Sequence, residues 1–245
     1  MPSELAAVRG EPSYVWRSGQ ERRLRMIANW ATLDAALILE DGCGIGTYAS
    51  QFARRFHARV EALDIEAERV AEAHKEVPHA LVGACEHLPY PSNVFDLVFS
   101  NEVIEHVQDD RATAAEMVRV ARPGGRIILF CPNRWYPFET HGFYWRGKYH
   151  FGNTPLINYL PDGLRNRLAP HVRAYTAHSL LALFRDQPVR VVEHTRIFGG
   201  YDNIARRTPT LGAILRAALY TAEGTPLRIA GLSHFLVLEK TLLSS

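Results

Sequence analysis

Two carboxylates and an imidazole stand close together in the segment Ser100-Asn-Glu-Val-Ile-Glu-His106-Val. The unperturbed pKa of histidine is about 6.5, so His106 suits a general base that removes a proton near neutral pH. If the segment is helical, Glu102 and His106 are i,i+4 neighbours on one face. A structural histidine bonded to Glu102 or to the backbone is the alternative. The three side chains, Glu105 included, are also ligand types for a divalent ion, but the sequence offers nothing that completes the coordination, so no metal is expected.

A glycine loop follows an apolar run, in Leu37-Ile-Leu-Glu-Asp-Gly-Cys-Gly-Ile-Gly46-Thr-Tyr. Glycines at these positions allow positive φ and a close approach of backbone to a ligand, although they can also serve only a tight turn. The spacing G-x-G-x-G differs from the dinucleotide fingerprint, which would need glycine at Thr47, and the Walker A lysine is absent. The two acidic residues before the loop disfavour a pyrophosphate and favour a ligand that carries a sulfonium or ammonium group.

A further carboxylate, Asp64, ends the next apolar run, Arg59–Asp64. At the tip of a strand, such a side chain can accept hydrogen bonds from both hydroxyls of a ribose. The alternative is a cap for the helical pattern that follows, because Asp is a good N-cap residue. The two roles are compatible.

The segment from residue 132 to residue 176 is rich in aromatic side chains and is interrupted by Pro and Gly. Ten of its 45 residues are aromatic, against 10% of the whole chain, which is typical of a lid or pocket wall. The alternative is that these rings form only the core of the lid. The candidate substrate-binding residues are Glu102, Arg134, Trp135, Glu139, Tyr144 and Trp145, and His141 is a second candidate base.

Elements that can position these residues follow from the alternation of β-branched runs with helical patterns, which predicts a parallel sheet with helices on both faces. The expected strands cover 37–40, 59–64, 80–83, 95–100, 125–131, 189–197 and 235–240. The expected helices cover 19–31, 47–57, 66–77, 109–122, 177–185 and 211–222. We expect one domain over 1–245, with a cofactor-binding core (19–131), the lid (132–176) and the remainder of the sheet (177–245), which carries a helical insertion near 199–230.

Four motifs in order over residues 37–131 resemble those of class I S-adenosylmethionine-dependent methyltransferases. They are the glycine loop with its acidic strand tip, Leu88-Pro-Tyr-Pro-Ser-Asn-Val-Phe-Asp96-Leu-Val, the segment from Ser100 to Val107, and Arg122-Pro-Gly-Gly125. The pattern is similar to the small-molecule, ubiquinone-pathway-like group of these enzymes. The resemblance implies an α/β fold: a Rossmann-like, doubly wound, mostly parallel sheet of seven strands with an antiparallel final strand and an aromatic-rich lid insertion.

The resemblance also implies which residues bind the cofactor, S-adenosylmethionine. Asp64 would hold the ribose, Ile65 would pack on the adenine, and His106 would lie near the donor methyl group. Ala84 stands where relatives often carry an adenine-binding Asp, so the backbone N–H of Cys85 and the carboxylate of Glu86 are the expected substitutes. The full set expected at the cofactor is Glu40, Gly42, Gly44, Gly46, Asp64, Ile65, Cys85, Glu86 and Asn101.

Composition narrows the class of partner. The chain of 245 residues is 47% hydrophobic and 22% charged, which is globular. Its net charge of +2 divides into −5 over residues 1–131 and +7 over residues 132–245. That asymmetry is too weak for a nucleic-acid partner but is compatible with peripheral contact with an acidic membrane surface. Three scattered cysteines, no 18-residue apolar window and no apolar N-terminal leader predict a cytoplasmic protein without a transmembrane segment or secretory signal.

The sequence therefore predicts an enzyme that transfers a methyl group from S-adenosylmethionine, leaving S-adenosylhomocysteine, to a small aromatic, lipidic or glycosylated acceptor. Methylation of a hydroxyl oxygen is favoured because His106 supplies a base, and methylation of nitrogen or carbon remains an alternative. A non-catalytic protein that binds S-adenosylmethionine as a sensor or partner subunit is the rival from another class. A nucleotide-sugar or dinucleotide enzyme on a similar sheet is a further rival.

Overall fold

The computed structural model describes residues 15–242. The N-terminal segment, for which the sequence predicts no secretory signal, lies outside these residues. Within the range 15–242, no helix combines the length and the apolar character that crossing a bilayer requires.

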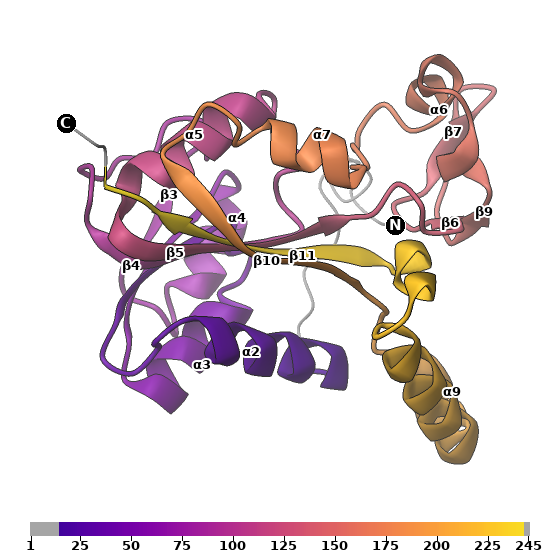
Figure 1. The fold of residues 1–245 in the computed structure, drawn as a ribbon, viewed down its shortest axis with the longest axis horizontal. Coiled ribbons are helices and arrows are strands. Elements are labelled where there is room, and N and C mark those ends of the chain that lie inside the picture. The colour runs from indigo at the N-terminus through magenta and orange to yellow at the C-terminus, as the bar shows by residue number, and fades with distance from the viewer. Residues whose placement is uncertain (1–14, 243–245) are drawn as a thin grey trace.

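A sheet of seven strands runs through the middle of the molecule (Figure 1). Its strands are β1 (Leu37–Asp41), β2 (Arg59–Asp64), β3 (Ala80–Val82), β4 (Phe95–Asn101), β5 (Ala121–Pro132), β10 (Val189–Ile197) and β11 (Ser233–Lys240). Their spatial order is β10-β11-β5-β4-β1-β2-β3. The five strands from β3 to β5 are parallel, and β11 pairs antiparallel with both β5 and β10. The predicted sheet, with its antiparallel final strand, is confirmed.

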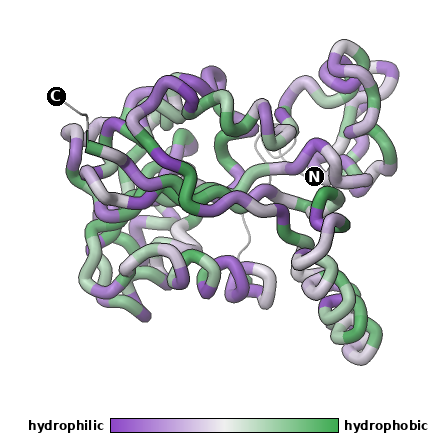
Figure 2. Tube along the Cα trace, in the orientation of Figure 1, coloured by the Kyte–Doolittle hydropathy of each residue, from purple (hydrophilic) through white to green (hydrophobic). Residues whose placement is uncertain are grey.

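Helices cover both faces of the sheet (Figure 1). On one face lie α2 (Ser18–Trp30), α3 (Thr47–Phe56) and α4 (Ala67–Ala73), and on the other lie α5 (Asp110–Val120) and α7 (Ala177–Ala182). Each layer buries an apolar core against the sheet. Leu24, Ile27 and Phe52 pack on the first face, and Met117 and Leu180 pack on the second. The central strands β1 and β4 are buried over most of their length, as expected of a sheet covered on both sides, and Figure 2 shows apolar and polar segments mixed across the middle of the molecule.

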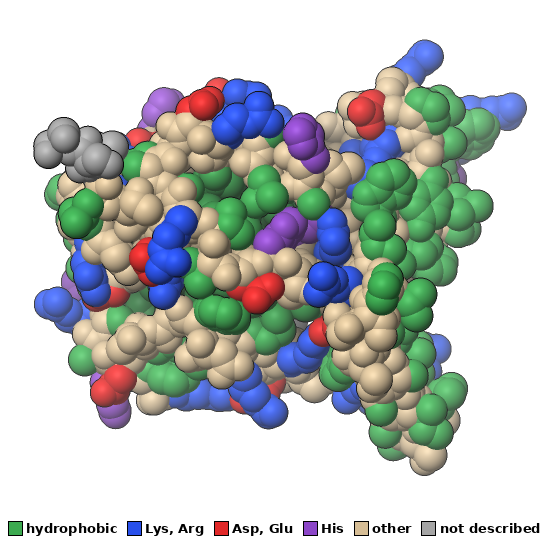
Figure 3. Space-filling view, viewed as in Figure 1, with side chains coloured by type: hydrophobic (Ala, Val, Ile, Leu, Met, Phe, Trp, Pro, Cys, Tyr) green, Lys and Arg blue, Asp and Glu red, His purple; other side chains and the backbone are tan. Residues whose placement is uncertain are grey.

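Two insertions extend from the same end of the sheet (Figure 1). The first, between β5 and α7, is the predicted lid. It contains the strands β6 (Phe138–Glu139), β7 (Phe143–Trp145), β8 (Lys148–His150) and β9 (Thr154–Pro155), the short helix η1 (Ile157–Tyr159) and α6 (Asp162–Leu168). The second, between β10 and β11, contains α8 (Asp202–Arg207), α9 (Pro209–Ala222) and η2 (Pro226–Ala230). Apolar side chains gather on the surface of both insertions (Figure 3).

The segment after β4 departs from the helix considered for it. Residues 102–109 form a loop with a turn, in which the His106 N–H donates to the Val103 carbonyl at 2.8 Å, and α5 begins only at Asp110. Glu102 lies at the left-handed φ of +57°, which is incompatible with a helix that starts there. Glu102 and His106 therefore do not share a helical face. The helix expected over 66–77 is also shorter, since α4 ends at Ala73.

Candidate functional site

The glycine loop connects β1 to α3 through backbone conformations that suit glycine. Gly42, Gly44 and Gly46 have φ of +68°, +54° and +76°, in the left-handed region that other residues adopt only with strain. A Cβ at position 42 would also lie 2.3 Å from the Val103 side chain, on the loop after β4. Glycine at position 42 therefore allows two loops at the carboxyl edge of the sheet to approach each other.

Asp64 ties the glycine loop to the segment after β2. Its Oδ2 accepts a hydrogen bond from the Gly44 N–H at 2.8 Å, and its Oδ1 accepts one from the Glu66 N–H at 2.9 Å. Each carboxylate oxygen has a second lone pair, so the side chain is fixed in place with acceptor capacity to spare. This is the arrangement that a ribose diol requires of a strand-tip carboxylate.

The end of β1 is strongly acidic. Glu40 and Asp41 are buried, and one oxygen of Glu40 has no hydrogen-bond partner within the described chain. Burial raises the pKa of Glu40 well above its usual value, against a backbone hydrogen bond from Ala49, and the neighbouring Asp41 and Asp64 raise it further. Burial also raises the pKa of Asp41, to about 7. A cationic ligand at the glycine loop would relieve this accumulation of buried carboxyl groups.

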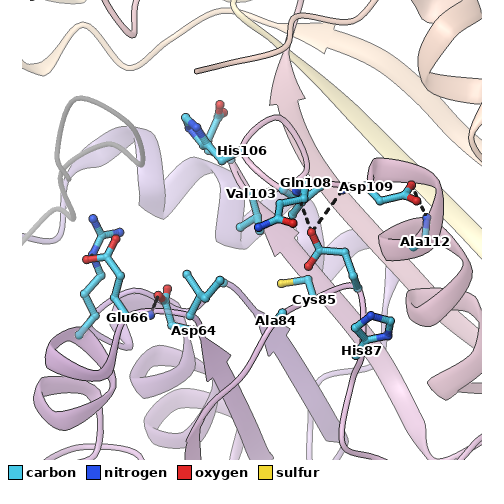
Figure 4. Close-up of a pocket in the computed structure, with 16 residues that line it drawn as sticks. Asp64, Glu66, Ala84, Cys85, His87, Val103, His106, Gln108, Asp109 and Ala112 are labelled. Carbon is cyan, nitrogen blue, oxygen red and sulfur yellow. Dashed lines mark hydrogen bonds and ion pairs between the residues drawn. The ribbon is translucent and has the colours of Figure 1, made fainter. Parts of the chain in front are cut away.

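A cavity of about 380 Å³ opens above these loops. Figure 4 shows that its walls come from the segments after β2 (Asp64, Glu66), β3 (Ala84, Cys85) and β4 (His106). Among the expected cofactor residues, it collects Gly42, Asp64, Ile65, Cys85 and Glu86. Its size is in the range of small-molecule sites.

The side chains at the adenine end of the cavity differ in what they offer. Ile65 is 48% exposed, which leaves an apolar surface open for a flat ring. Cys85 is buried, and burial raises the pKa of its thiol well above the usual value, so the residue remains a neutral thiol. One oxygen of Glu86 accepts hydrogen bonds from the N–H groups of Gln108 and Asp109, at 2.7 and 3.3 Å. Glu86 therefore fastens the loop after β4 to the wall of the cavity.

Asn101 lies in a second, neighbouring cavity of about 250 Å³, which Arg23 and Tyr48 also line. Arg23 extends from α2 over the face of Phe130 and donates to Asn101 at 2.6 Å and to Glu102 at 2.7 Å. Glu102 lines the first cavity, and although burial opposes its ionisation, Arg23 lowers its pKa overall. Arg23 thus connects the two cavities and holds Glu102 as a carboxylate.

His106 lies where the first cavity meets the lid. Its ring is 5.2 Å from that of His141, and its Nδ1 lies 3.3 Å from the His171 carbonyl oxygen. Because a carbonyl only accepts, Nδ1 carries the hydrogen and Nε2 keeps its lone pair. Burial and the adjacent His141 lower the pKa of His106 to about 4, so the ring is neutral near neutral pH. The loop after β4 therefore presents a neutral imidazole with a free acceptor nitrogen.

The candidate residues of the lid separate into two groups. Glu139 and Tyr144 lie on its inner side: Glu139 is buried, contacts His141 and pairs with Arg165 at 2.8 Å, while Tyr144 packs on His171. Burial opposes ionisation of Glu139, but its hydrogen bonds from His141 and the charge of Arg165 lower its pKa to about 2.

The other three candidate residues of the lid make their contacts away from His106. Arg134 donates to the Leu160 carbonyl and pairs with Asp162, so its guanidinium serves the lid itself. Trp135 is 43% exposed beside Tyr159, and Trp145, at the end of β7, is 55% exposed. The structure therefore brings His106, His141, Glu139 and Tyr144 together and leaves Arg134, Trp135 and Trp145 on the outer parts of the lid.

Sequence reasoning missed Arg23, Arg165 and His171. A signal existed for Arg23: it lies four residues before the buried Ile27, so the helical pattern already places it on the face of α2 that meets the sheet. No local pattern distinguishes Arg165 or His171, because their partners lie on other strands of the lid and on the loop after β4.

Comparison with known proteins shows that the chain is similar to methyltransferases. A family model described as a methyltransferase domain matches residues 39–129. A malonyl-[acyl-carrier protein] O-methyltransferase of Yersinia pestis is 28% identical over 199 residues, 78% of this chain and 73% of its own length. The norajmaline N-methyltransferase of Rauvolfia serpentina is 34% identical over 100 residues, 38% of this chain and only 34% of its own length.

The fold of the chain is also similar to that of solved methyltransferase structures. The structure of an S-adenosylmethionine-dependent methyltransferase from Mesorhizobium loti aligns with a TM-score of 0.63 at 16% identity, over 91% of this chain and 98% of that one. Since the family model covers the glycine loop, the acidic strand tip and the loop after β4, the motifs and the matches agree. Residues 39–129 therefore carry a methyltransferase domain, and the matches together support a class I S-adenosylmethionine-dependent methyltransferase, for which S-adenosylmethionine is the cofactor.

Proposed function

We propose that this enzyme methylates a hydroxyl oxygen of a small-molecule acceptor held between the first cavity and the lid. The observation that supports this most directly is the position of His106, which lines the cavity and also contacts His141 of the lid. The similarity to an enzyme named as an O-methyltransferase over 78% of the chain supports oxygen as the acceptor atom, whereas the named N-methyltransferase matches only 38%.

Bound S-adenosylmethionine supplies a methyl group activated by a sulfonium charge and leaves as S-adenosylhomocysteine. The residues present fit this cofactor: the orphaned oxygen of Glu40 and the carboxyl groups around it favour a cation, and Asp64 has spare acceptor capacity for the ribose. We assign the adenine to the surface of Ile65, with the backbone N–H of Cys85 and the remaining oxygen of Glu86 as its polar contacts. Asn101 acts through Arg23, at the methionine end.

His106 handles the proton of the acceptor. Its neutral ring can take the hydroxyl proton on Nε2 as the acceptor oxygen forms its bond to the methyl carbon. The His171 carbonyl holds Nδ1 and so orients the ring. His141, from the lid, is the second candidate for this role and lies against the same ring.

Single-turnover methyl transfer by a His106→Ala variant tests the proposal, with a screen of hydroxyl-bearing acceptors as the substrate source. We expect the rate to fall roughly 10²–10⁴-fold, the usual contribution of acid–base catalysis, while S-adenosylmethionine affinity and the melting temperature stay near wild type. His79→Ala, at an exposed position directly before β3, is the matched control.

Two outcomes would overturn the proposal. A His106→Ala variant as fast as wild type would exclude His106 as the base and would direct the test to His141. A wild-type protein that binds S-adenosylmethionine but releases no S-adenosylhomocysteine with any acceptor in the screen would instead support the rival role of a cofactor-binding sensor or partner subunit.

The acceptor itself is apolar in this proposal, because the outer surface of the lid is apolar. The exposed rings of Trp135, Trp145 and Phe151 lie on the lid, and the insertion that carries α9 extends from the same end of the sheet. An aromatic or lipidic acceptor reaches such a site from an acidic membrane surface, which the basic second half of the chain would attract. The three cysteines are free and buried, which supports a reducing compartment, the cytoplasm.

A further inference from the structure

Three side chains of metal-ligating type converge beneath the lid. Glu105 and His106 belong to the loop after β4, and His141 belongs to the lid, between β6 and β7. A carboxylate oxygen of Glu105 and a ring nitrogen of each histidine all lie within 4.8 Å of one another. Ligands 2.0–2.2 Å from an ion lie at most about 4.4 Å apart, so only a small contraction would bring these three atoms onto one ion.

The carboxyl group of Glu105 forms no ion pair at contact distance among the described residues, and another carboxylate, Glu102, acts on it. The side chain of Glu105 is 1% exposed, and neither of its carboxylate oxygens accepts a hydrogen bond. Burial, with the nearby carboxylate of Glu102, raises the pKa of Glu105 well above its usual value. A buried carboxyl group without a hydrogen bond is costly for a fold unless a cation compensates it. An ion between Glu105 and the two imidazoles would supply that compensation.

The Nδ1 atom of each ring faces an oxygen acceptor, as it does in many histidines that bind a metal through Nε2. Nδ1 of His106 faces the His171 carbonyl at 3.3 Å, and Nδ1 of His141 faces the Glu139 carboxylate at 3.3 Å. Glu139 is itself fixed by the buried Arg165 at 2.8 Å. A carbonyl or carboxylate on the outer nitrogen fixes the tautomer and leaves Nε2 as the ligand atom, which is the usual second shell of a metal site.

From these observations we infer that Glu105, His106 and His141 form a binding site for one divalent first-row transition-metal ion. Two imidazoles and one carboxylate favour ions such as Zn²⁺, Co²⁺, Mn²⁺ or Fe²⁺ over the harder Ca²⁺ and Mg²⁺. The sequence suggested no metal because Glu102, Glu105 and His106 alone do not complete a site. The ligand that completes it, His141, arrives only when the lid folds over the loop after β4.

The place of this ion gives it a role that rests on the proposed function. His106 lines the first cavity, so open coordination positions would face the acceptor and the cofactor. An ion there would bind and polarise the acceptor oxygen and lower the pKa of its hydroxyl group. With its Nε2 engaged as a ligand, His106 would not take the proton in the metal-bound enzyme. The proton released from the acceptor hydroxyl group would pass to the carboxylate of Glu102, which lines the same cavity. Because one ligand comes from the lid, ion binding would also hold the lid closed on the loop.

Zinc binding by the full chain tests the site without any need for an acceptor. The protein, freed of metal with a chelator, is titrated with Zn²⁺ in a calorimeter, and Co²⁺ is added in parallel to follow its visible absorption. We expect one ion per chain and a Co²⁺ spectrum of nitrogen and oxygen ligands. Glu105→Gln and His141→Ala should each weaken Zn²⁺ binding at least tenfold, whereas His79→Ala, the exposed control, should bind as wild type does.

Two further measurements separate a binding defect from misfolding and from failure of the proposed function. Glu105→Gln keeps the shape of the side chain and replaces a buried carboxyl group by a neutral amide, so its metal-free melting temperature should equal or exceed that of wild type. Affinity for S-adenosylmethionine should be unchanged in both variants. Failure of wild type to retain zinc through gel filtration, or equal zinc affinity in wild type and Glu105→Gln, would overturn the site while leaving methyl transfer to be judged by its own test.

Discussion

Among single residues, we expect Asp64 to contribute most directly to cofactor binding. Replacement by Ala removes the charge-assisted hydrogen bonds expected to the ribose, each worth about 1.5–3 kcal/mol. We therefore expect affinity for S-adenosylmethionine, measured by calorimetry, to fall on the order of tenfold to a thousandfold in Asp64→Ala. Unchanged affinity in a folded variant would contradict the assignment of the ribose to this carboxylate.

A matched substitution distinguishes ribose binding from support of the loops. Asp64 also accepts hydrogen bonds from the N–H groups of Gly44 and Glu66, so Asp64→Ala perturbs the glycine loop as well. Asp64→Asn keeps one oxygen and the shape of the side chain but loses the charge. An affinity for Asp64→Asn between those of Ala and wild type, with a melting temperature close to wild type, is the expected pattern.

Arg23 gives a second prediction at this scale. It is the half-buried partner of Glu102 and Asn101, and its guanidinium lies 4.6 Å from the centre of the Phe130 ring. Arg23→Met keeps the apolar stem but leaves Glu102 without its counter-charge. Because a half-buried carboxylate without its partner is costly, we expect a loss of about 1–3 kcal/mol in the free energy of unfolding, measured in urea. Arg25→Met, on the exposed side of α2, should change it by less than about 0.5 kcal/mol.

These residues differ in how far the sequence could predict their place. Gly42 and Asp64 were predictable, because a strand, a turn and a strand tip fix them within short stretches of chain. The pairing of Glu102 with Arg23 was not, because it joins α2 to the loop after β4 across 79 positions of sequence. The same is true of Glu105 and His141. The roles of the candidate residues stay predictions until the variants above are measured.

Among the elements, β10 and β11 carry a pair of linked histidines that makes stability depend on pH. Nε2 of His234 lies 2.8 Å from the Tyr175 carbonyl, so it donates, and its Nδ1 accepts from Nε2 of His194 at 3.0 Å. Burial lowers the pKa of both rings to about 4, and for His194 the charges of Arg196 and Arg228 add to this effect. Both rings are therefore neutral in the folded protein near neutral pH.

The sign of the pH dependence follows from the lowered pKa values. The unfolded chain, with histidine pKa values near 6.5, binds more protons between pH 6.5 and 4 than the folded chain does. The contribution of this pair to the free energy of unfolding is fully present above pH 6.5 and is lost as the pH falls towards 4. The fully buried His234 contributes up to about 3 kcal/mol of that change. Urea unfolding of His234→Gln at several pH values should show a shallower loss than wild type.

His79→Gln is the control for this measurement, because His79 is exposed. It should follow the wild-type dependence of unfolding free energy on pH. If His234→Gln also follows it, other groups dominate the acid destabilisation and the histidine pair is not its source.

Regular elements were predicted better than the loops between them. β2 and β10 have the predicted bounds, since short runs rich in β-branched and apolar residues are a local signal for a strand. The helix considered for Glu102 to His106 was wrong, because the positive φ of Glu102 depends on contacts outside the segment: Arg23 from α2 and Ser233 from β11 both bind its carboxylate. Tertiary contacts therefore determine the conformation of this segment, and the helix propensity of its residues does not.

At the scale of the whole molecule, the excess positive charge of residues 132–245 coincides with an unpartnered apolar surface. The helix α9 has one charged side chain, Arg216, and Asp202 already binds it. Its Leu211 and Ile214 are 54% and 62% exposed, and on η2 Leu227 and Ile229 are 66% and 51% exposed. We call these four side chains the α9 surface, and Figure 3 shows green side chains along this part of the molecule.

The α9 surface has the composition of an interfacial membrane contact. The exposed basic residues Arg206 and Arg207 of α8 and Arg228 of η2 lie in the same insertion. Apolar side chains that enter the acyl boundary and arginines that face anionic headgroups act together in such contacts. A membrane at the α9 surface would be consistent with the apolar acceptor proposed above, because the lid and the α9 surface extend from the same end of the sheet (Figure 1).

Sedimentation with lipid vesicles measures the contact. We expect the protein to bind vesicles that contain phosphatidylserine more tightly than vesicles of phosphatidylcholine alone, and to lose that preference at high salt, because the charge term is screened. Full burial of one large apolar side chain contributes about 1.5–3 kcal/mol, so Ile214→Ser with Leu227→Ser should weaken binding at least tenfold. Val82→Ser, at an exposed position on β3 at the opposite edge of the sheet, should leave vesicle binding unchanged.

Equal binding by the double variant and by Val82→Ser would exclude the α9 surface as the contact. A wild-type protein that stays in the supernatant with both kinds of vesicle would exclude the membrane as its partner.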